Sequence, residues 1–133
     1  MSPAVSQRDL LHRWIEQVAQ VIAALLRGPP PVDLAPARQQ VDAALAQHLG
    51  PLATLVPTLD VASAAALLAD PDRIFAYARL LLLAAEVDLA SGHADGGAGR
   101  QRALDFAAAA LARAPGPRPE WAAWLAAARP PAE

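Results

Sequence analysis

The sequence predicts an all-α protein of about six helices, arranged as antiparallel helical hairpins. Hydrophobic residues make up 55% of the 133 residues, yet aromatic residues make up only 5%, so alanine and leucine carry most of the apolar content. Alanine and leucine are among the strongest helix formers, whereas strands favour aromatic and β-branched residues. Thirteen prolines and seven glycines divide the chain into segments of helical length and indicate where the helices end.

The length fits a single helical domain over residues 1–133, with disordered tails expected at 1–5 and 130–133. A domain of this size buries about two thirds of its unfolded surface, so its core requires no metal and no disulfide. The chain contains no cysteine, which excludes thiol catalysis, thiolate metal sites and disulfides. We expect no cofactor.

The charge pattern argues against a nucleic-acid-binding protein. The formal net charge is −2, and all eleven basic residues are arginines scattered along the chain. Nucleic-acid-binding domains concentrate basic residues on one face. The N-terminal residues contain no apolar signal core, and no uncharged apolar run approaches the length of a membrane span. We therefore expect a cytoplasmic protein that binds neither nucleic acid nor a membrane.

The first helix is expected over residues 7–27, where apolar residues recur at alternating intervals of four and three. Ser6 is a suitable N-cap, and Gly28 followed by three prolines ends the helix. The stripe expected to face the core is Leu11, Ile15, Val18, Ile22 and Leu25.

A second helix is expected to begin near Pro36 and to end at Leu49, before a Gly-Pro pair. Arg38 falls on the side of this helix that we expect to face solvent. His48, near its end, indicates either a favourable charge at the negative end of the helix dipole or a partly buried ring. Residues 51–59 are then expected to form a packed, irregular connection.

Two aspartates mark the next helix starts. Asp60 is a suitable N-cap for a short third helix over residues 61–68. Asp70 is followed by Pro71 and a second acid, which together supply an N-cap, a first-turn proline and a charge that suits the helix dipole.

This start predicts a fourth helix, Pro71–Ala90, that is apolar on nearly every side and therefore central to the fold. Its polar residues Asp72, Arg79 and Glu86 recur every seven positions, so we expect one narrow strip to face water.

Two more helices are expected after Ser91 and Gly92. A mobile, glycine-rich loop is predicted at residues 93–99, and a fifth helix over 100–114. A sixth helix begins at Pro119 and ends before the next pair of prolines. Its apolar stripe is Trp121, Trp124, Leu125 and Ala128.

Small residues in the fifth helix allow a neighbouring helix to approach closely. Ala103, Ala107 and Ala110 share one face and precede Pro115, a spacing that resembles the second helix of a tetratricopeptide repeat. Ala85 and Gly92 match the small residue and the turn glycine of that repeat's first helix. The glycine loop between the two helices is longer than in that repeat, and Asp88 stands where an aromatic residue is usual.

Over residues 7–114 the chain also resembles a family of short bacterial all-helical proteins of unknown function that are related to tetratricopeptide folds. The segments that carry this resemblance are QRDLL at 7–11, IEQ at 15–17 and VDAAL at 41–45. The resemblance implies a helical-hairpin fold. It implies no activity and no site residue.

Two groups of polar residues contain the side-chain types that bind metal ions. Asp9, His12 and Glu16 share one helix face and offer two carboxylates and an imidazole, but a solvated face with ordinary i to i+4 partners is the simpler interpretation. His93 and Asp95 are likewise interpreted as a polar loop tip. We expect no metal site.

Glu86 is the acidic residue with the most apolar neighbours in the sequence. If its side chain is buried, Arg100 or Arg102 across the hairpin would be its partner, and otherwise it is exposed beside Arg79. A site made of Glu86, Asp88 and an arginine inside the hairpin would make the chain a small-molecule-binding bundle or an enzyme.

The tryptophans are the predicted partner-binding residues, because indole rings bury large areas and anchor interfaces. They are Trp14, Trp121 and Trp124. Docking of the last helix onto the chain's own core would also explain Trp121 and Trp124, and we prefer that interpretation. A polyproline-binding groove lined by all three is a further alternative.

The sequence contains no catalytic grouping and no phosphate-binding glycine loop after a strand. It therefore predicts a non-enzymatic protein–protein interaction or homo-oligomerisation module, with a homodimer as one form. The alternative is the small-molecule-binding bundle or enzyme that uses Glu86 and Asp88.

Overall fold

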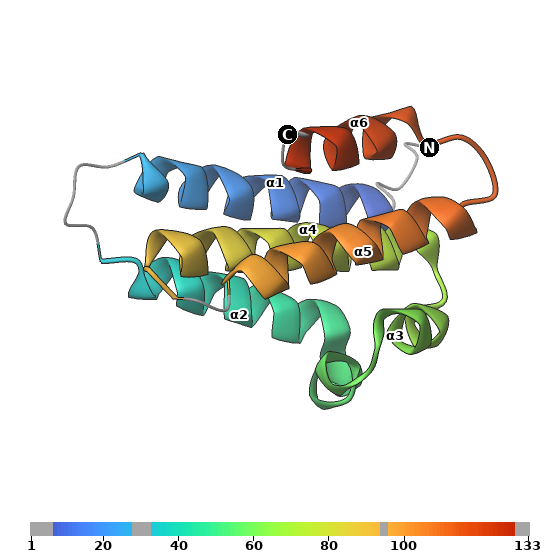
Figure 1. The fold of residues 1–133 in the computed structure, drawn as a ribbon, viewed down its shortest axis with the longest axis horizontal. Helices are drawn as coiled ribbons and strands as arrows, with labels where there is room; N and C mark the ends of the chain where they lie inside the picture. Colours follow the sequence, from blue (N-terminus) through green and yellow to red (C-terminus); the bar gives the residue numbers. More distant parts are fainter. Residues whose placement is uncertain (1–6, 28–32, 94–95, 130–133) are drawn as a thin grey trace, which may run out of the picture.

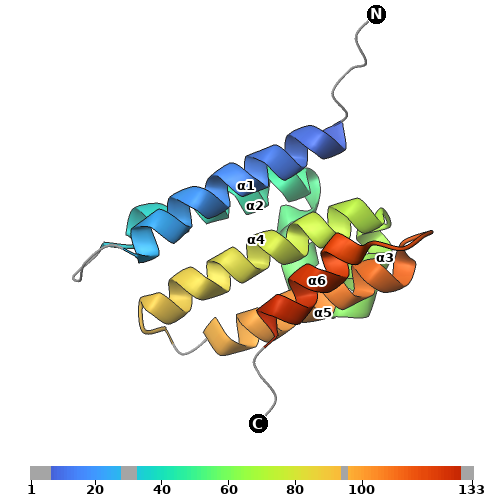
Figure 2. The same cartoon turned by 90° about the horizontal axis from the view of Figure 1, so that it is seen from above.

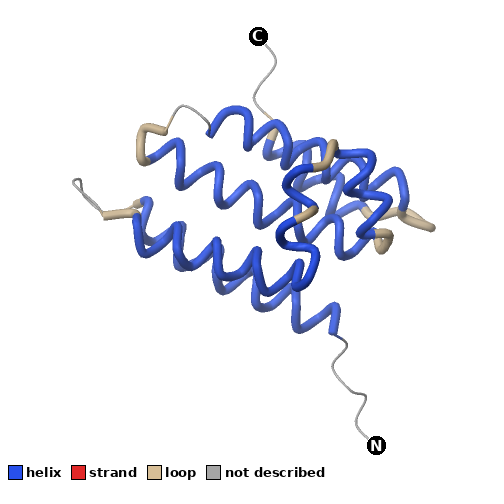
Figure 3. Tube along the Cα trace, turned by 90° about the horizontal axis from the view of Figure 1, so that it is seen from below, coloured by secondary structure: helices blue, strands red, loops and turns tan. Residues whose placement is uncertain are grey.

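A computed structural model describes residues 7–27, 33–93 and 96–129, without the side chains of 7–12 and Leu25. These residues form six α-helices and two short 3-10 helices, and no strand (Figure 3). The predicted all-α class is therefore confirmed. The elements are α1 (Gln7–Leu26), α2 (Ala35–Leu49), η1 (Gly50–Thr54), η2 (Val56–Thr58), α3 (Val61–Leu68), α4 (Pro71–Ala90), α5 (Gly96–Arg113) and α6 (Pro119–Ala128). The predicted Ser6 cap and the tails at 1–5 and 130–133 lie outside the described residues.

The fold is built around α4. This helix lies between the α1–α2 pair and the α5–α6 pair (Figure 2), and 11 of its 20 residues are buried. The colours of Figure 1, which follow the chain from its N-terminus to its C-terminus, show that α5 runs antiparallel to α4, as the hairpin pattern predicts. Ala103, Ala107 and Ala110 of α5 are fully buried, which is expected where small side chains let two helices pack closely.

The two predicted aspartate caps form as expected. The Asp60 carboxylate accepts a hydrogen bond from the backbone N–H of Ser63 at 3.1 Å, and α3 begins at the next residue. The Asp70 carboxylate accepts one from the N–H of Asp72 at 3.0 Å at the start of α4. Each cap satisfies a helical N–H that has no partner within the helix. Both helices have the bounds that the sequence predicts.

The α1 stripe is confirmed where its side chains are described, because Ile15, Val18 and Ile22 are all buried. The side chains of Leu11 and Leu25 lie outside the described part of the chain. Residues 50–58 form η1 and η2 instead of an irregular connection, and Val56 anchors them in the core.

The water-facing strip predicted on α4 is wrong. Asp72 is only 7% exposed, the Arg79 side chain is 13% exposed, and Glu86 is half-buried. The sevenfold recurrence does place these residues on one helix face. That face is covered because α1, α2, α5 and α3 all pack on α4, so no full-length side is left for solvent.

The glycine-rich segment is also more regular than predicted. Helix α5 begins at Gly96, so the predicted loop at 93–99 becomes helix from that residue on, and residues 94–95 lie outside the described ones. A Cβ atom at Gly96 would lie 2.6 Å from Cγ of Leu89. The absence of a side chain there lets the start of α5 pass against the end of α4.

Candidate functional site

Helix α6 packs its aromatic residues on α4. The Trp121 ring is buried and stacks on Phe75, with ring centroids 4.5 Å apart and planes 13° from parallel. The half-buried Trp124 contacts the same ring in a T-shaped arrangement at 5.3 Å. This packing agrees with the preferred interpretation, in which α6 docks on the chain's own core.

A cavity of about 330 Å³ opens between α1, α4 and α6 beside these rings. We call it the aromatic cavity. Arg79 of α4 donates a hydrogen bond to the carboxylate of Glu16 on α1, so an ion pair forms part of its wall. The residues that line it are Glu16, Phe75, Arg79, Glu120, Trp121 and Trp124.

Trp14 does not line the aromatic cavity. Its half-buried ring packs against the hydrophobic clusters that join α1, α2 and α4, which contain Val18, Ala44 and Leu80. The structure therefore brings Trp121 and Trp124 together and places Trp14 apart from them. A groove lined by all three rings does not form in this arrangement.

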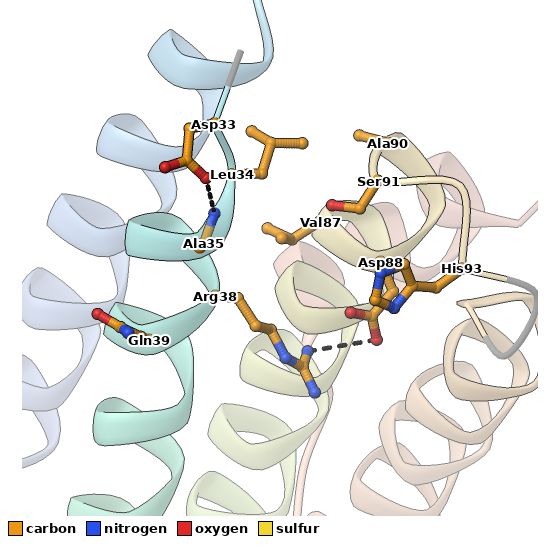
Figure 4. Close-up of a pocket in the computed structure, with 10 residues that line it drawn as sticks. All are labelled: Asp33, Leu34, Ala35, Arg38, Gln39, Val87, Asp88, Ala90, Ser91 and His93. Carbon is orange, nitrogen blue, oxygen red and sulfur yellow. Dashed lines mark hydrogen bonds and ion pairs between the residues drawn. The ribbon is translucent and has the colours of Figure 1, made fainter. Parts of the chain in front are cut away.

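A second, larger cavity lies between the start of α2 and the end of α4 (Figure 4). Its volume is about 680 Å³, and we call it the polar cavity. In Figure 4 the Arg38 side chain of α2 points across the opening to Asp88 of α4, whereas Gln39 points away from α4. The lining residues are Asp33, Leu34, Ala35, Arg38, Gln39, Val87, Asp88, Ala90, Ser91 and His93.

Arg38 ties the two walls of the polar cavity together. Its Nη1 lies 3.4 Å from Oδ2 of Asp88 on α4, and its Nε lies 3.3 Å from Oδ1 of Asp42 on its own helix. Asp33 accepts a hydrogen bond from the backbone N–H of Ala35, the first residue of α2, at 3.0 Å. Arg38 was expected to face solvent, and its half-buried position follows from a partner in another helix.

Glu86 and Asp88 do not form one site. The Asp88 carboxylate faces Arg38 of α2, whereas the Glu86 carboxylate lies in the electrostatic field of Arg100 on α5. Burial raises the pKa of Glu86, and the positive charge of Arg100 opposes that rise. Of the two predicted partners, Arg102 is engaged elsewhere, since it donates to the carbonyls of Val56 and Leu59, the latter at 2.9 Å.

Replacing Glu86 with glutamine is expected to stabilise the protein at pH 7. Because the pKa of Glu86 is higher in the folded than in the unfolded state, ionisation at neutral pH favours unfolding. The wild type therefore loses stability as the pH rises from about 4.5 through the raised pKa, and the variant does not. We expect a gain of about 0.5 kcal/mol at pH 7 that disappears below the unfolded-state pKa. Urea unfolding at a series of pH values measures it.

The control for this prediction is Glu120→Gln, which alters an exposed carboxylate on α6 and should give no comparable gain. A Glu86→Gln variant that is less stable than the wild type at pH 7 would show that the Glu86–Arg100 attraction outweighs the cost of burial.

His48 joins the end of α2 to the start of α4. Its Nε2 lies 3.0 Å from the carbonyl oxygen of Arg73, and the Arg73 guanidinium donates to the carbonyl of Leu49 at 3.2 Å. Burial lowers the pKa of His48, which keeps the ring neutral at pH 7. The partly buried ring is therefore the correct one of the two predicted alternatives.

The described residues do not bring the candidate metal ligands together into a site. Glu16 pairs with Arg79, and the side chains of Asp9 and His12 lie outside the described part. His93 lines the polar cavity, and Asp95 is not described. Within the described residues no cluster of three or more histidine or carboxylate side chains is placed to hold a metal ion.

In the described ranges, no helix combines the length and the apolar character needed to cross a bilayer. Comparison of the chain with protein-family models, with curated proteins and with solved structures finds no match in any of the three, so the resemblance to tetratricopeptide folds stays a prediction.

Proposed function

We propose that this protein is a non-enzymatic interaction module that binds a protein partner, or a second copy of itself, through the aromatic cavity. The observation that carries the proposal is the position of Trp124. Its indole is only half-buried and lies beside a cavity, while the neighbouring Trp121 is fixed on Phe75. Partly exposed tryptophans next to a pocket are typical of residues that dominate protein–protein binding energy.

The walls of the aromatic cavity are held in place before any partner binds. Stacking of Trp121 on Phe75 fixes α6, and the Arg79–Glu16 ion pair joins α4 to α1. A preformed surface loses little conformational entropy on binding, which favours affinity. Its volume of about 330 Å³ lies at the lower end of the range for small-molecule pockets and suits a protruding side chain.

The proposal includes a cytoplasmic location, a relation to bacterial tetratricopeptide-like proteins, and no nucleic-acid or membrane partner. These parts rest on the sequence, namely its scattered arginines, its net charge of −2 and its alanine-spaced hairpin.

Replacing Trp124 with alanine is expected to weaken association at least tenfold, whether with a partner or with a second copy of the chain. The matched control is Val21→Ala, which shortens an exposed apolar side chain on α1, outside the cavity. Size-exclusion chromatography with light scattering measures self-association, and pull-down with each immobilised variant compares the captured partners. A wild type that stays monomeric at all concentrations, and captures the same proteins as Trp124→Ala, would contradict the proposal.

A second candidate function is small-molecule binding in the polar cavity. The supporting observation is its volume of about 680 Å³, with the charged pair Arg38 and Asp88 in its lining. In this candidate function the small-molecule site would lie at the α2–α4 junction, and not inside the α4–α5 hairpin with Glu86 and Asp88. Thermal-shift screening with Arg38→Gln as the negative control tests it, because a true ligand should stabilise the wild type alone.

A further inference from the structure

We infer that the aromatic cavity receives a cationic side chain, an arginine guanidinium or a lysine ammonium, from the partner polypeptide. This inference rests on the proposed function and adds the chemistry of the partner. The lining contains two carboxylates, Glu16 and Glu120, and one guanidinium, Arg79. These three described side chains sum to a formal charge of −1, which a single positive charge would neutralise.

Glu120 is the carboxylate that lacks compensation. Arg79 pairs with Glu16, whereas Glu120 has no ion pair or hydrogen bond within the described residues. Glu120 and Trp124 are four residues apart on α6, so their side chains lie on the same helix face. The chain thus offers a carboxylate and an aromatic ring side by side, which is the combination that binds organic cations.

A cation–π contact already exists at Trp121, the neighbouring tryptophan on α6. The guanidinium of Arg118 lies 5.2 Å from the ring centroid of Trp121, whose ring also stacks on Phe75. Trp121 is therefore fully engaged by residues of its own chain. Among the described residues no cation lies over the Trp124 ring. This ring can therefore form a cation–π contact with a side chain of the partner.

Other guests fit the cavity less well. An anionic side chain would be repelled by the uncompensated carboxylate of Glu120. An apolar side chain would remove water from Glu120 without supplying a hydrogen-bond partner, and burying an unpaired carboxylate is costly. A cation gains from the ring and from the carboxylate together.

The test uses two acetylated, amidated peptides of sequence Ala-Leu-X-Leu-Ala, with arginine or its neutral isostere citrulline at X. The indole N–H signals in ¹H–¹⁵N NMR spectra of the full chain report where each peptide binds. We expect the arginine peptide to shift the Trp124 signal and to bind about tenfold more tightly than the citrulline peptide, with that difference shrinking at high salt.

Variants localise the effect. Glu120→Gln, read at the Trp124 signal, and Trp124→Leu, read at the signal of the neighbouring Trp121, should each weaken binding of the arginine peptide about fivefold or more. The matched control Asp105→Asn removes an exposed carboxylate on α5, outside the cavity, and should leave the affinity unchanged. Circular dichroism of each variant verifies the fold.

Equal binding of the two peptides at Trp124 would overturn the cationic guest and leave the interaction module standing. Failure of both peptides to shift the Trp124 signal would likewise overturn the cationic guest. The interaction module itself fails only if Trp124→Ala changes neither association nor partner capture.

Discussion

Replacing Leu82 with aspartate is expected to unfold the protein or to leave it without fixed tertiary packing. Leu82 lies in α4 and is only 7% exposed. An unpaired carboxylate in such a position costs about 3–5 kcal/mol, which is comparable to the total stability of a small domain. Near-ultraviolet circular dichroism and thermal unfolding measure the loss.

The same substitution at Leu67 of α3 is the control, because that side chain is 41% exposed and an aspartate there remains hydrated. We expect Leu67→Asp to change stability by no more than about 0.5 kcal/mol. A Leu82→Asp variant that melts cooperatively at the wild-type temperature would show that α4 is not enclosed by its neighbours.

Helix starts could be predicted because their signals are local. Asp60 and Asp70 each bond to a backbone N–H two or three residues ahead, so sequence spacing alone determines the contact. Gly50 and Gly92, both with positive φ, follow the ends of α2 and α4 by a similarly local rule. The bounds of α3 and α4 therefore follow from the sequence.

Burial of polar residues could not be predicted in the same way. The period of seven that relates Arg79 to Glu86 identifies a helix face, but it does not show how many helices pack on that face. Arg38 pairs with Asp88 and Arg79 with Glu16, each across different helices. Such pairs become visible only when the packing of the hairpins is known.

The candidate site was partly predictable. The stripe that contains Trp121 and Trp124 indicates an aromatic face on the last helix. Phe75 and Glu120 were missed as members of the site. The sequence contains an indication for Glu120, because it precedes Trp124 by four residues and so shares its helix face. Phe75 has no such local indication, since it reaches the cavity only through the packing of α4 on α6.

Replacing Phe106 with alanine is expected to destabilise the protein by about 3–5 kcal/mol. Phe106 of α5 is fully buried, and its ring meets Tyr77 of α4 edge to face, with centroids 4.9 Å apart. The Arg102 guanidinium lies 4.9 Å from the centre of the same ring. Truncation would leave a cavity between the two central helices. Urea unfolding measures the change.

Tyr77→Phe provides the matched comparison, because it keeps the ring that contacts Phe106 and removes only the hydroxyl, beside which Arg102 lies. Its expected cost is about 1 kcal/mol. Tyr77→Ala combined with Phe106→Ala completes a double-mutant cycle, and the edge-to-face contact predicts a coupling of about 0.5–1.5 kcal/mol. If Phe106→Ala cost less than Tyr77→Phe, the two rings would not form the junction between α4 and α5. The alanine-lined faces would then have to hold the hairpin without them.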